Sequence, residues 1–261
     1  TPKPSSAASD VYKRQALLNL IKPFKNKNVG CVAGHLVYIP ENTPTGSEQG
    51  ESLFVTLDSL IREAESSLGF QTGVDGGLYA IRSKLYQELP SDIISDFVTP
   101  LNILLAGYMI KYTKEAIYRE KPPSKSSILV LKRRRRIVAR TIRGMVWFLQ
   151  SCRGSIWRKI IIALAVFVRK ILRWLTLIPF SMFLISLGFL TLENPFYSSL
   201  AFLIYILLAI SVFSIFMEKK TKLPKIISIS GYIIIMLVAG ILGLLDAITG
   251  KKYTTWSPRA D

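Results

Sequence analysis

Hydrophobic and polar residues follow two different patterns along the chain, and the change between them falls near residue 130. Before it, short apolar segments alternate with polar loops. Residues 29–39 are apolar and rich in β-branched side chains, which predicts a buried strand. From Ser52, hydrophobic residues recur at three- and four-residue steps, which predicts an amphipathic helix that Gly69 ends.

The next segments continue this mixed pattern. A glycine-rich turn at residues 73–77 leads into the strand-like sequence LYAIRSKLY. A helical pattern then covers residues 97–110, and a further strand is expected over residues 111–118. Residues 16–130 are therefore predicted to form an α/β region.

After residue 173 the pattern becomes almost uniformly apolar. Three stretches without charge cover residues 174–192, 194–217 and 226–245. Because about 20 apolar residues cross a bilayer core as a helix, they predict three transmembrane helices within residues 174–250, followed by a tail at residues 251–261.

Positive charge is concentrated just before these stretches. The chain has 261 residues and a net charge of +17, and 18 Lys and Arg but only two acids lie between Lys111 and Arg173. Residues 131–173 are expected to form basic amphipathic helices in the membrane interface, where they attract anionic lipid. Nucleic acid is the other partner that such charge attracts, but the adjacent spans favour lipid, and we expect no nucleic acid partner.

The same charges predict an orientation. The turn at residues 218–225 contains four lysines and one glutamate, whereas the turn at residues 193–195 contains no basic residue. By the positive-inside rule, the basic segment and the second turn lie in the cytoplasm, which leaves the tail outside. Lys251 and Lys252 favour the opposite side for the tail, and a re-entrant third segment would reconcile the two.

Cysteine and histidine offer little for catalysis. Cys31 and Cys152 are far apart and fit neither a disulfide framework nor a zinc site. His35, the single histidine, stands in an apolar stretch, where a structural role is more common than a catalytic one.

The first fifteen residues are expected to lie outside the fold. The string DVYKRQ at residues 10–15 back-translates as GAT GTG TAT AAG AGA CAG, which resembles a transposon end used in preparing sequencing libraries. We interpret residues 1–15 as a disordered sequencing artefact, although an ordinary polar N-terminus has a similar composition.

An ordered set of motifs occupies the α/β region. PF-x4-VG-x-V-x-G starts at Pro23, E-x2-S-x-L-G at Glu63 and G-x-D-G-x-L-Y-A-I-R at Gly73. DF-x2-PL follows at Asp96, then GY, then a basic R-x2-R segment. Near the end, TWSPR at residues 255–259 looks like a W-x-P-x-R tail. This order resembles the second half of membrane-bound family 2 glycosyltransferases, which include the cellulose, hyaluronan and chitin synthases.

The resemblance implies a GT-A fold and an inverting sugar transfer. Asp96 matches the family's catalytic base, with Ser95 in place of the acid that often precedes it. A carboxylate is suited to take the proton of an acceptor hydroxyl as the glycosidic bond forms. The alternative is that Asp96 caps the following helix, and Asp92 is a poorer candidate for the base.

The resemblance also implies sites for the acceptor and the pyrophosphate. In the turn at residues 73–77, Gly73 and Gly76 allow the backbone to approach the sugar or acceptor, and Asp75 can bind hydroxyl groups; a plain turn is the alternative. Arg133 and Arg136 match the family's Q-x-x-R-W motif loosely. Arg136 would offset pyrophosphate charge, with lipid-facing basic residues as the alternative.

The family's D-x-D motif is absent from this sequence. In the family that motif binds the nucleotide-sugar and a divalent metal, Mg or Mn. We therefore expect residues 16–130 to be the C-terminal half of a GT-A domain, with a donor and metal only in a full-length enzyme. The chain by itself is expected to bind no metal and to transfer no sugar.

Three functions remain in competition. The first is a multi-pass inner-membrane transferase with a cytoplasmic catalytic domain, acting on a lipid-linked or polysaccharide acceptor. The second is a non-enzymatic membrane scaffold that binds anionic lipid. The third is a small transporter or channel subunit, which the scarcity of ionisable residues in the apolar stretches disfavours.

Overall fold

The computed structural model describes residues 14–39, 44–91, 93–122, 126–217, 224–251 and 253. Several sequence-based predictions fall wholly or largely outside these ranges: the leader at 1–15, the candidate Asp92, the turn at 218–225 and the motif at 255–259. The described chain forms two compact units that interleave along the sequence. We call them the sheet unit (Thr1–Ile39, Leu53–Lys121 and Arg140–Val166) and the helical unit (Pro40–Ser52, Pro122–Ala139 and Phe167–Asp261).

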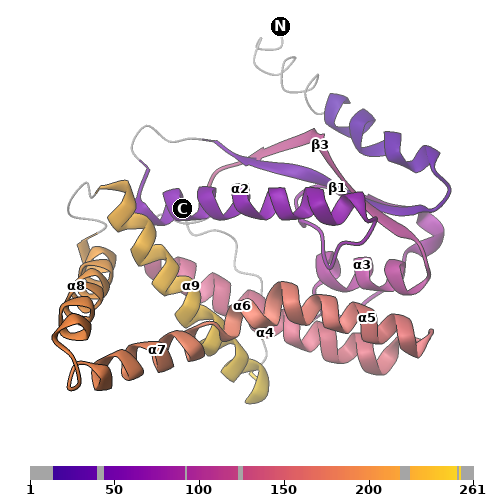
Figure 1. The fold of residues 1–261 in the computed structure, drawn as a ribbon. Coiled ribbons are helices and arrows are strands. Elements are labelled where there is room, and N and C mark those ends of the chain that lie inside the picture. Colours follow the sequence, from indigo (N-terminus) through magenta and orange to yellow (C-terminus); the bar gives the residue numbers. More distant parts are fainter. Residues whose placement is uncertain are drawn as a thin grey trace, which may run out of the picture. The chain divides into compact units, whose positions relative to one another are not determined.

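The sheet unit contains a three-stranded sheet in the order β2-β1-β3. The central strand β1 (Val29–Tyr38) pairs antiparallel with β2 (Tyr79–Ile81) and parallel with β3 (Met109–Glu120). Figure 1 shows the two long strands, β1 and β3, side by side. Burial explains why β1 lacks the alternation of a half-exposed strand: its first six residues are all buried. The predicted strands at 29–39 and 111–118 are thus present.

Helices surround this sheet. Residues 14–21 are helical and continue into the 3-10 helix η1 (Lys22–Lys25), as Pro23 predicted. The 3-10 helix η2 (Ser83–Leu85) follows β2, and α3 (Ser95–Leu105) precedes β3. Between β1 and β2 runs α2 (Gly46–Ser67), whose C-terminal end is followed by Gly69 at φ +69°, in the left-handed region that glycine favours.

The start of α2 differs from the sequence-based prediction. The helix begins at Gly46, six residues before Ser52. The backbone N–H of Glu48 donates to Thr45 Oγ1 at 3.3 Å, and the N–H of Thr45 donates to Glu48 Oε2 at 2.7 Å. This reciprocal pair is a capping box, which satisfies two donors at the helix end and so sets the earlier start.

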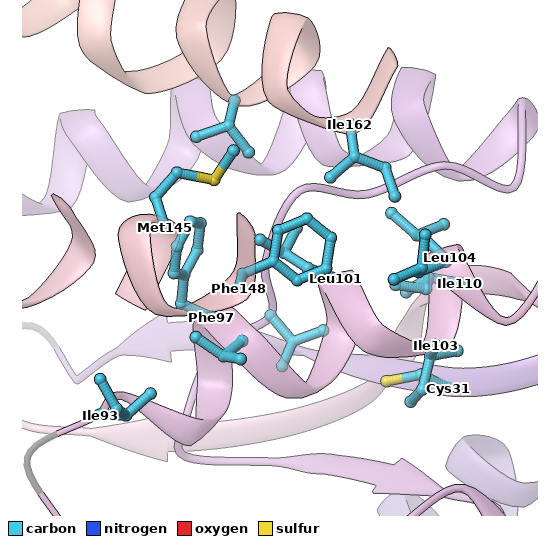
Figure 2. Close-up of a cluster of buried hydrophobic side chains, with 14 of the residues drawn as sticks. Cys31, Ile93, Phe97, Leu101, Ile103, Leu104, Ile110, Met145, Phe148 and Ile162 are labelled. Carbon is cyan, nitrogen blue, oxygen red and sulfur yellow. The ribbon is translucent and has the colours of Figure 1, made fainter. Parts of the chain in front are cut away.

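The main core of the sheet unit lies where α3, α4 (Ser127–Ser151) and α5 (Ile156–Val166) meet the sheet. Figure 2 shows Phe97 and Leu101 of α3 close to Met145 and Phe148 of α4. Ile162 of α5 completes this cluster of buried side chains. This packing fixes the first turn of α3 and therefore fixes the position of Asp96.

The helical unit contains the first part of α4 and the remaining helices. They are the π-helix η3 (Phe167–Ile171), α6 (Leu172–Leu175), α7 (Leu177–Leu190), α8 (Pro195–Met217) and α9 (Lys225–Ile248). By length and composition, α8 and α9 are long and apolar enough to cross a membrane, whereas α7 has 14 residues. Within the described residues the structure thus contains two helices of this kind, and the third predicted span corresponds to α6 and α7 together.

Candidate functional site

The glycine-rich turn at residues 73–77 is held tightly in the sheet unit. A Cβ added at Gly77 would lie 2.2 Å from the ring of Tyr118, and one added at Gly76 would lie 2.9 Å from Asp96 Oδ2. A Cβ at Gly77 would overlap the Tyr118 ring, so this position favours glycine, whereas a Cβ at Gly76 would require the Asp96 carboxylate to shift. The turn therefore brings its backbone against the carboxylate of Asp96, and two separate predicted motifs meet.

Asp96 occupies the first turn of α3. Its backbone carbonyl accepts a hydrogen bond from the N–H of Val74 at 3.0 Å, which ties the helix to the glycine-rich turn. The N-cap of α3 is Ile94, so the alternative to the catalytic role, in which Asp96 is the N-cap, is wrong. A carboxylate in the first turn still interacts favourably with the helix dipole.

Arg62 of α2 binds the backbone of the same turn. Its Nε donates to Asp58 Oδ2 at 2.6 Å, and one terminal nitrogen donates to the carbonyl of Gly73 at 3.2 Å. The Arg62 side chain is only 18 % exposed. Burial opposes its charge, but Asp58 and Asp75 outweigh burial and raise the pKa of Arg62. The sequence analysis missed this residue, although its i,i+4 spacing from Asp58 signals an ion pair.

Asp75 is hydrogen-bonded to the hydroxyl of Tyr118. Burial first, and the carboxylate of Asp75 second, raise the pKa of Tyr118. The phenol therefore stays protonated and donates to Asp75. Asp75, predicted to bind acceptor hydroxyls, is thus held in place by a protein hydroxyl and by the nearby Arg62.

His35 and Cys31 of β1 make structural contacts. His35 Nδ1 is hydrogen-bonded to the hydroxyl of Tyr112, and the two rings meet edge to face. Burial, followed by the charge of Lys114, lowers the pKa of His35. Burial raises the pKa of the Cys31 thiol to about 12, which leaves it unreactive.

The predicted arginines of the basic run lie in the helical unit, not in the sheet unit with Asp96. Glu51 is fully buried, and its two oxygens lie 3.7 Å from Arg133 and 2.6 Å from Arg134. Arg136 is half-buried on the same helix. The Nη1 of Arg133 is buried without a hydrogen-bond partner among the described residues, and the nearby Glu51 carboxylate offsets part of its charge.

Two further arginines, missed by the sequence analysis, lie on the part of α4 that belongs to the sheet unit. The Nε of Arg140 and both terminal nitrogens of Arg143 are buried and have no hydrogen-bond partner among the described residues. The neighbouring Gly144 packs against Phe97 and Val98, so this turn of α4 lies beside the first turn of α3. Buried donors without acceptors are costly in a protein interior, and an anion would satisfy them. The sequence did contain a signal for this pair, because residues three apart on one helix lie on the same face.

The described residues contain no group of three or more His, Cys, Asp or Glu that could hold a metal ion. Asp96 and Asp75 are the acids of the turn region, and Asp75 is engaged by Tyr118. These residues can bind hydroxyl groups and accept a proton, but they do not form a metal site.

Comparison with known proteins identifies the fold. Neither family models nor curated proteins gave a match to this sequence. Among solved structures, the mannosyltransferase PcManGT from Pyrobaculum calidifontis, in complex with GDP-mannose and Mn²⁺, is similar with a TM-score of 0.58 and 16% sequence identity. The similarity covers 91% of this chain and 59% of that chain. The chain therefore has a glycosyltransferase-like fold and spans little more than half of that mannosyltransferase's length.

Proposed function

We propose that this chain is the acceptor-side part of a membrane-bound, inverting family 2 glycosyltransferase. The enzyme would transfer a sugar from a nucleotide-sugar to a lipid-linked or polysaccharide acceptor, with its catalytic domain in the cytoplasm. One observation carries the proposal: on a glycosyltransferase-like fold, the Asp96 carboxylate lies against the backbone of the Gly76 turn. A carboxylate beside the backbone of a turn can accept the proton of an acceptor hydroxyl that the turn positions.

Asp96 is the proposed base. It takes the proton of the acceptor hydroxyl while the oxygen forms a bond to the anomeric carbon of the sugar. The bond from that carbon to the nucleoside diphosphate breaks on the opposite face, and the configuration inverts. General-base catalysis of this kind contributes about 10²- to 10⁴-fold.

Arg140 and Arg143 are the proposed ligands for negative charge. Their buried, unsatisfied nitrogens lie on the turn of α4 that packs against the first turn of α3. Guanidinium groups bind phosphate oxygens in a bidentate manner, and these hydrogen bonds are stronger where water is excluded. We assign them to the diphosphate leaving group or to an acceptor phosphate, in preference to Arg133.

The donor side is proposed by analogy. The similar mannosyltransferase is described with GDP-mannose and Mn²⁺, and a nucleotide-sugar and a divalent metal fit the family 2 resemblance. Among the described residues of this chain, no group of three or more His, Cys, Asp or Glu is placed to hold that metal.

The test uses the complete reading frame that encodes this sequence, expressed in membranes. Radiolabelled UDP-glucose, UDP-N-acetylglucosamine and GDP-mannose are supplied with Mn²⁺, and label is measured in the lipid and polysaccharide fractions. We expect transfer from at least one donor, and a loss of about 10²- to 10⁴-fold in Asp96→Asn. Glu63→Gln is the matched control, because Glu63 is exposed and its ion pair is with the exposed Lys114.

Three results would contradict the proposal. Equal transfer by Asp96→Asn and the parent would remove Asp96 as the base. The absence of transfer from every donor, with the protein folded in the membrane, would favour the scaffold instead. Transfer by residues 1–261 alone would overturn the assignment of this chain to the acceptor side only.

A further inference from the structure

Helix α2 is amphipathic, but along its second half the polar side faces inward. Ser59 and Ser66 are buried, and Asp58 and Arg62 on the same side are half-buried. The aliphatic residues of this segment are exposed: Leu53, Leu57, Leu60, Ile61 and Leu68. A helix on the surface of a globular protein usually buries its apolar side instead. Departures of this kind are common at functional sites, so the polar side of α2 is a candidate support for such a site.

The polar side of α2 binds both β3 and the glycine-rich turn. The N–H of Tyr112 donates to Ser66 Oγ at 2.8 Å, and Ser59 is hydrogen-bonded to the Tyr112 hydroxyl. Arg62 donates to the carbonyl of Gly73 at 3.2 Å. All these residues belong to the sheet unit. The helix therefore anchors the first residue of the turn through polar contacts.

Tyr118 of β3 holds the middle and the end of the same turn. Its hydroxyl is hydrogen-bonded to Asp75. Its ring lies against Gly77, where an added Cβ would be 2.2 Å from Cε2 of the ring and 2.8 Å from the hydroxyl oxygen. The backbone of Tyr118 is paired with Leu36 of the central strand β1. A side chain that starts from a paired strand has a well-defined position, so it can fix the turn.

The contacts of Tyr118 leave a surface for a ligand. Gly76 and Gly77 are exposed, and Asp75 is half-buried. Asp75 directly precedes Gly76, whose backbone lies against the Asp96 carboxylate. A carboxylate offers about four acceptor positions, and the Tyr118 hydroxyl fills one of them. Asp75 can therefore accept a hydrogen bond from a ligand while Tyr118 holds it.

The charge of this surface favours one class of ligand. Asp75 and Asp96 are both acids, and Arg62, a cation that binds the turn, is already paired with Asp58. A phosphate bound directly at the turn would face two carboxylates, which repel it. Hydroxyl groups, by contrast, donate hydrogen bonds to carboxylates. The turn is therefore suited to a sugar or another polyol.

We propose that Tyr118 is a positioning residue of the acceptor site, which fixes Asp75 so that this carboxylate binds a hydroxyl group of the acceptor sugar beside Asp96. Arg62 fixes the start of the turn, and Tyr118 fixes its middle. Tyr118 itself touches no reacting atom in this assignment, because its hydroxyl is used in holding Asp75. The inference rests on the proposed function, in which the turn belongs to the acceptor site and Asp96 is the base.

The test uses the complete protein in membranes, with the donor that supports transfer and with hexyl glycosides of glucose, mannose and N-acetylglucosamine as acceptor probes. Tyr118→Phe removes the hydroxyl and keeps the ring against Gly77. We expect the KM for the glycoside to rise about tenfold, as on loss of one hydrogen bond to a charged group, while kcat changes less. Tyr108→Phe is the matched control and should keep the parent KM, because Tyr108 is also half-buried but its ring lies beneath the Lys84 ammonium.

Two further measurements separate positioning from a structural role. In an Asp75→Ala background, Tyr118→Phe should leave the KM unchanged, because Tyr118 acts through Asp75. Hydrogen exchange of the amides at residues 73–77 should be faster in Tyr118→Phe than in the parent, and unchanged in Tyr108→Phe. The exchange measurement needs neither a donor nor an acceptor, so it tests the holding of the turn independently of sugar transfer.

The outcomes that overturn this inference differ from those that contradict the proposed function. An equal KM in Tyr118→Phe and the parent, or equal exchange at residues 73–77, would overturn the role of Tyr118 and leave the transferase intact. Transfer to the membrane fractions but to none of the glycosides would overturn the assignment of the turn to a sugar. Absence of transfer by the parent from every donor would contradict the proposed function as well.

Discussion

The two parts of α4 use arginine in different ways. In the helical unit, Arg134 and Arg135 are paired with the buried acids Glu51 and Asp246. In the sheet unit, Arg140 and Arg143 have buried nitrogens without a partner among the described residues. Arg133 of the helical unit also has a buried nitrogen without a hydrogen-bond partner among the described residues. The difference between the two parts of α4 therefore lies in the buried acids, because Glu51 and Asp246 form ion pairs with arginines of the helical unit only. The comparison teaches that charge density along a sequence does not show which cations are available to a ligand.

The largest effect on stability is expected at Glu51. Glu51→Gln leaves the guanidinium of Arg134 buried without its counter-ion, and removing one partner of a buried pair costs about 3–5 kcal/mol. Thermal unfolding in detergent should show a clearly lower Tm, with partial recovery in Glu51→Gln/Arg134→Gln. Glu63→Gln, in an exposed pair with Lys114, is the control and should cost under about 1 kcal/mol. An unchanged Tm in Glu51→Gln would show that the pairing of Arg134 is not structural.

Arg143 should affect activity instead of stability. Arg143→Ala removes two unsatisfied donors, so we expect an unchanged or raised Tm. Transfer by the complete protein should fall by about 10²-fold, as on loss of one preorganised charge-stabilising donor. Arg153→Ala, at an exposed position, is the control and should keep full activity. A lower Tm with normal transfer would mean that Arg143 is structural, and the comparison between the two parts of α4 would fail.

Arg62 should have an intermediate effect, because its ion pair and its bond to the turn both lie inside the sheet unit. Arg62→Lys keeps the charge but cannot bind Asp58 and the Gly73 carbonyl with one planar fork. We expect a loss of about 1–2 kcal/mol in unfolding free energy, in line with charged hydrogen bonds. The KM for acceptor should rise more than the kcat falls. No change in either quantity would show that Arg62 does not position the turn.

The smallest effect is expected from the pH dependence of His35. Its pKa is lowered in the folded state from 6.5, mainly by burial. The unfolded chain therefore binds the proton more readily, so His35 lowers stability as the pH falls below about 6.5 and contributes nothing above it. The Tm of the parent should fall more steeply than that of His35→Gln between pH 6.5 and 5, and the two curves should run parallel above pH 7. Parallel curves throughout would contradict the assignment.

The sequence predicted much of the sheet unit because its signals are local. The apolar run at 29–39, the glycine at residue 69 and the helix at 97–110 each carry their own periodicity or turn residue. The start of α2 was misplaced because the capping box at Thr45 lies beyond the hydrophobic pattern that was used. The meeting of Asp96 with Gly76 was not predicted, since nothing local joins positions 20 residues apart.

By itself, the sequence determined the mixed α/β region, the basic segment and the apolar stretches, since each depends on composition or short-range spacing. Only the tertiary structure decided which charges are paired. Glu51 and Arg134 are 83 residues apart, and Arg135 and Asp246 are 111 apart. Likewise, length and hydropathy make both α8 and α9 candidate spans, but only the structure shows that Asp246 of α9 pairs with Arg135. Long-range pairing depends on the packing of distant segments, and that packing leaves no periodic trace in the chain.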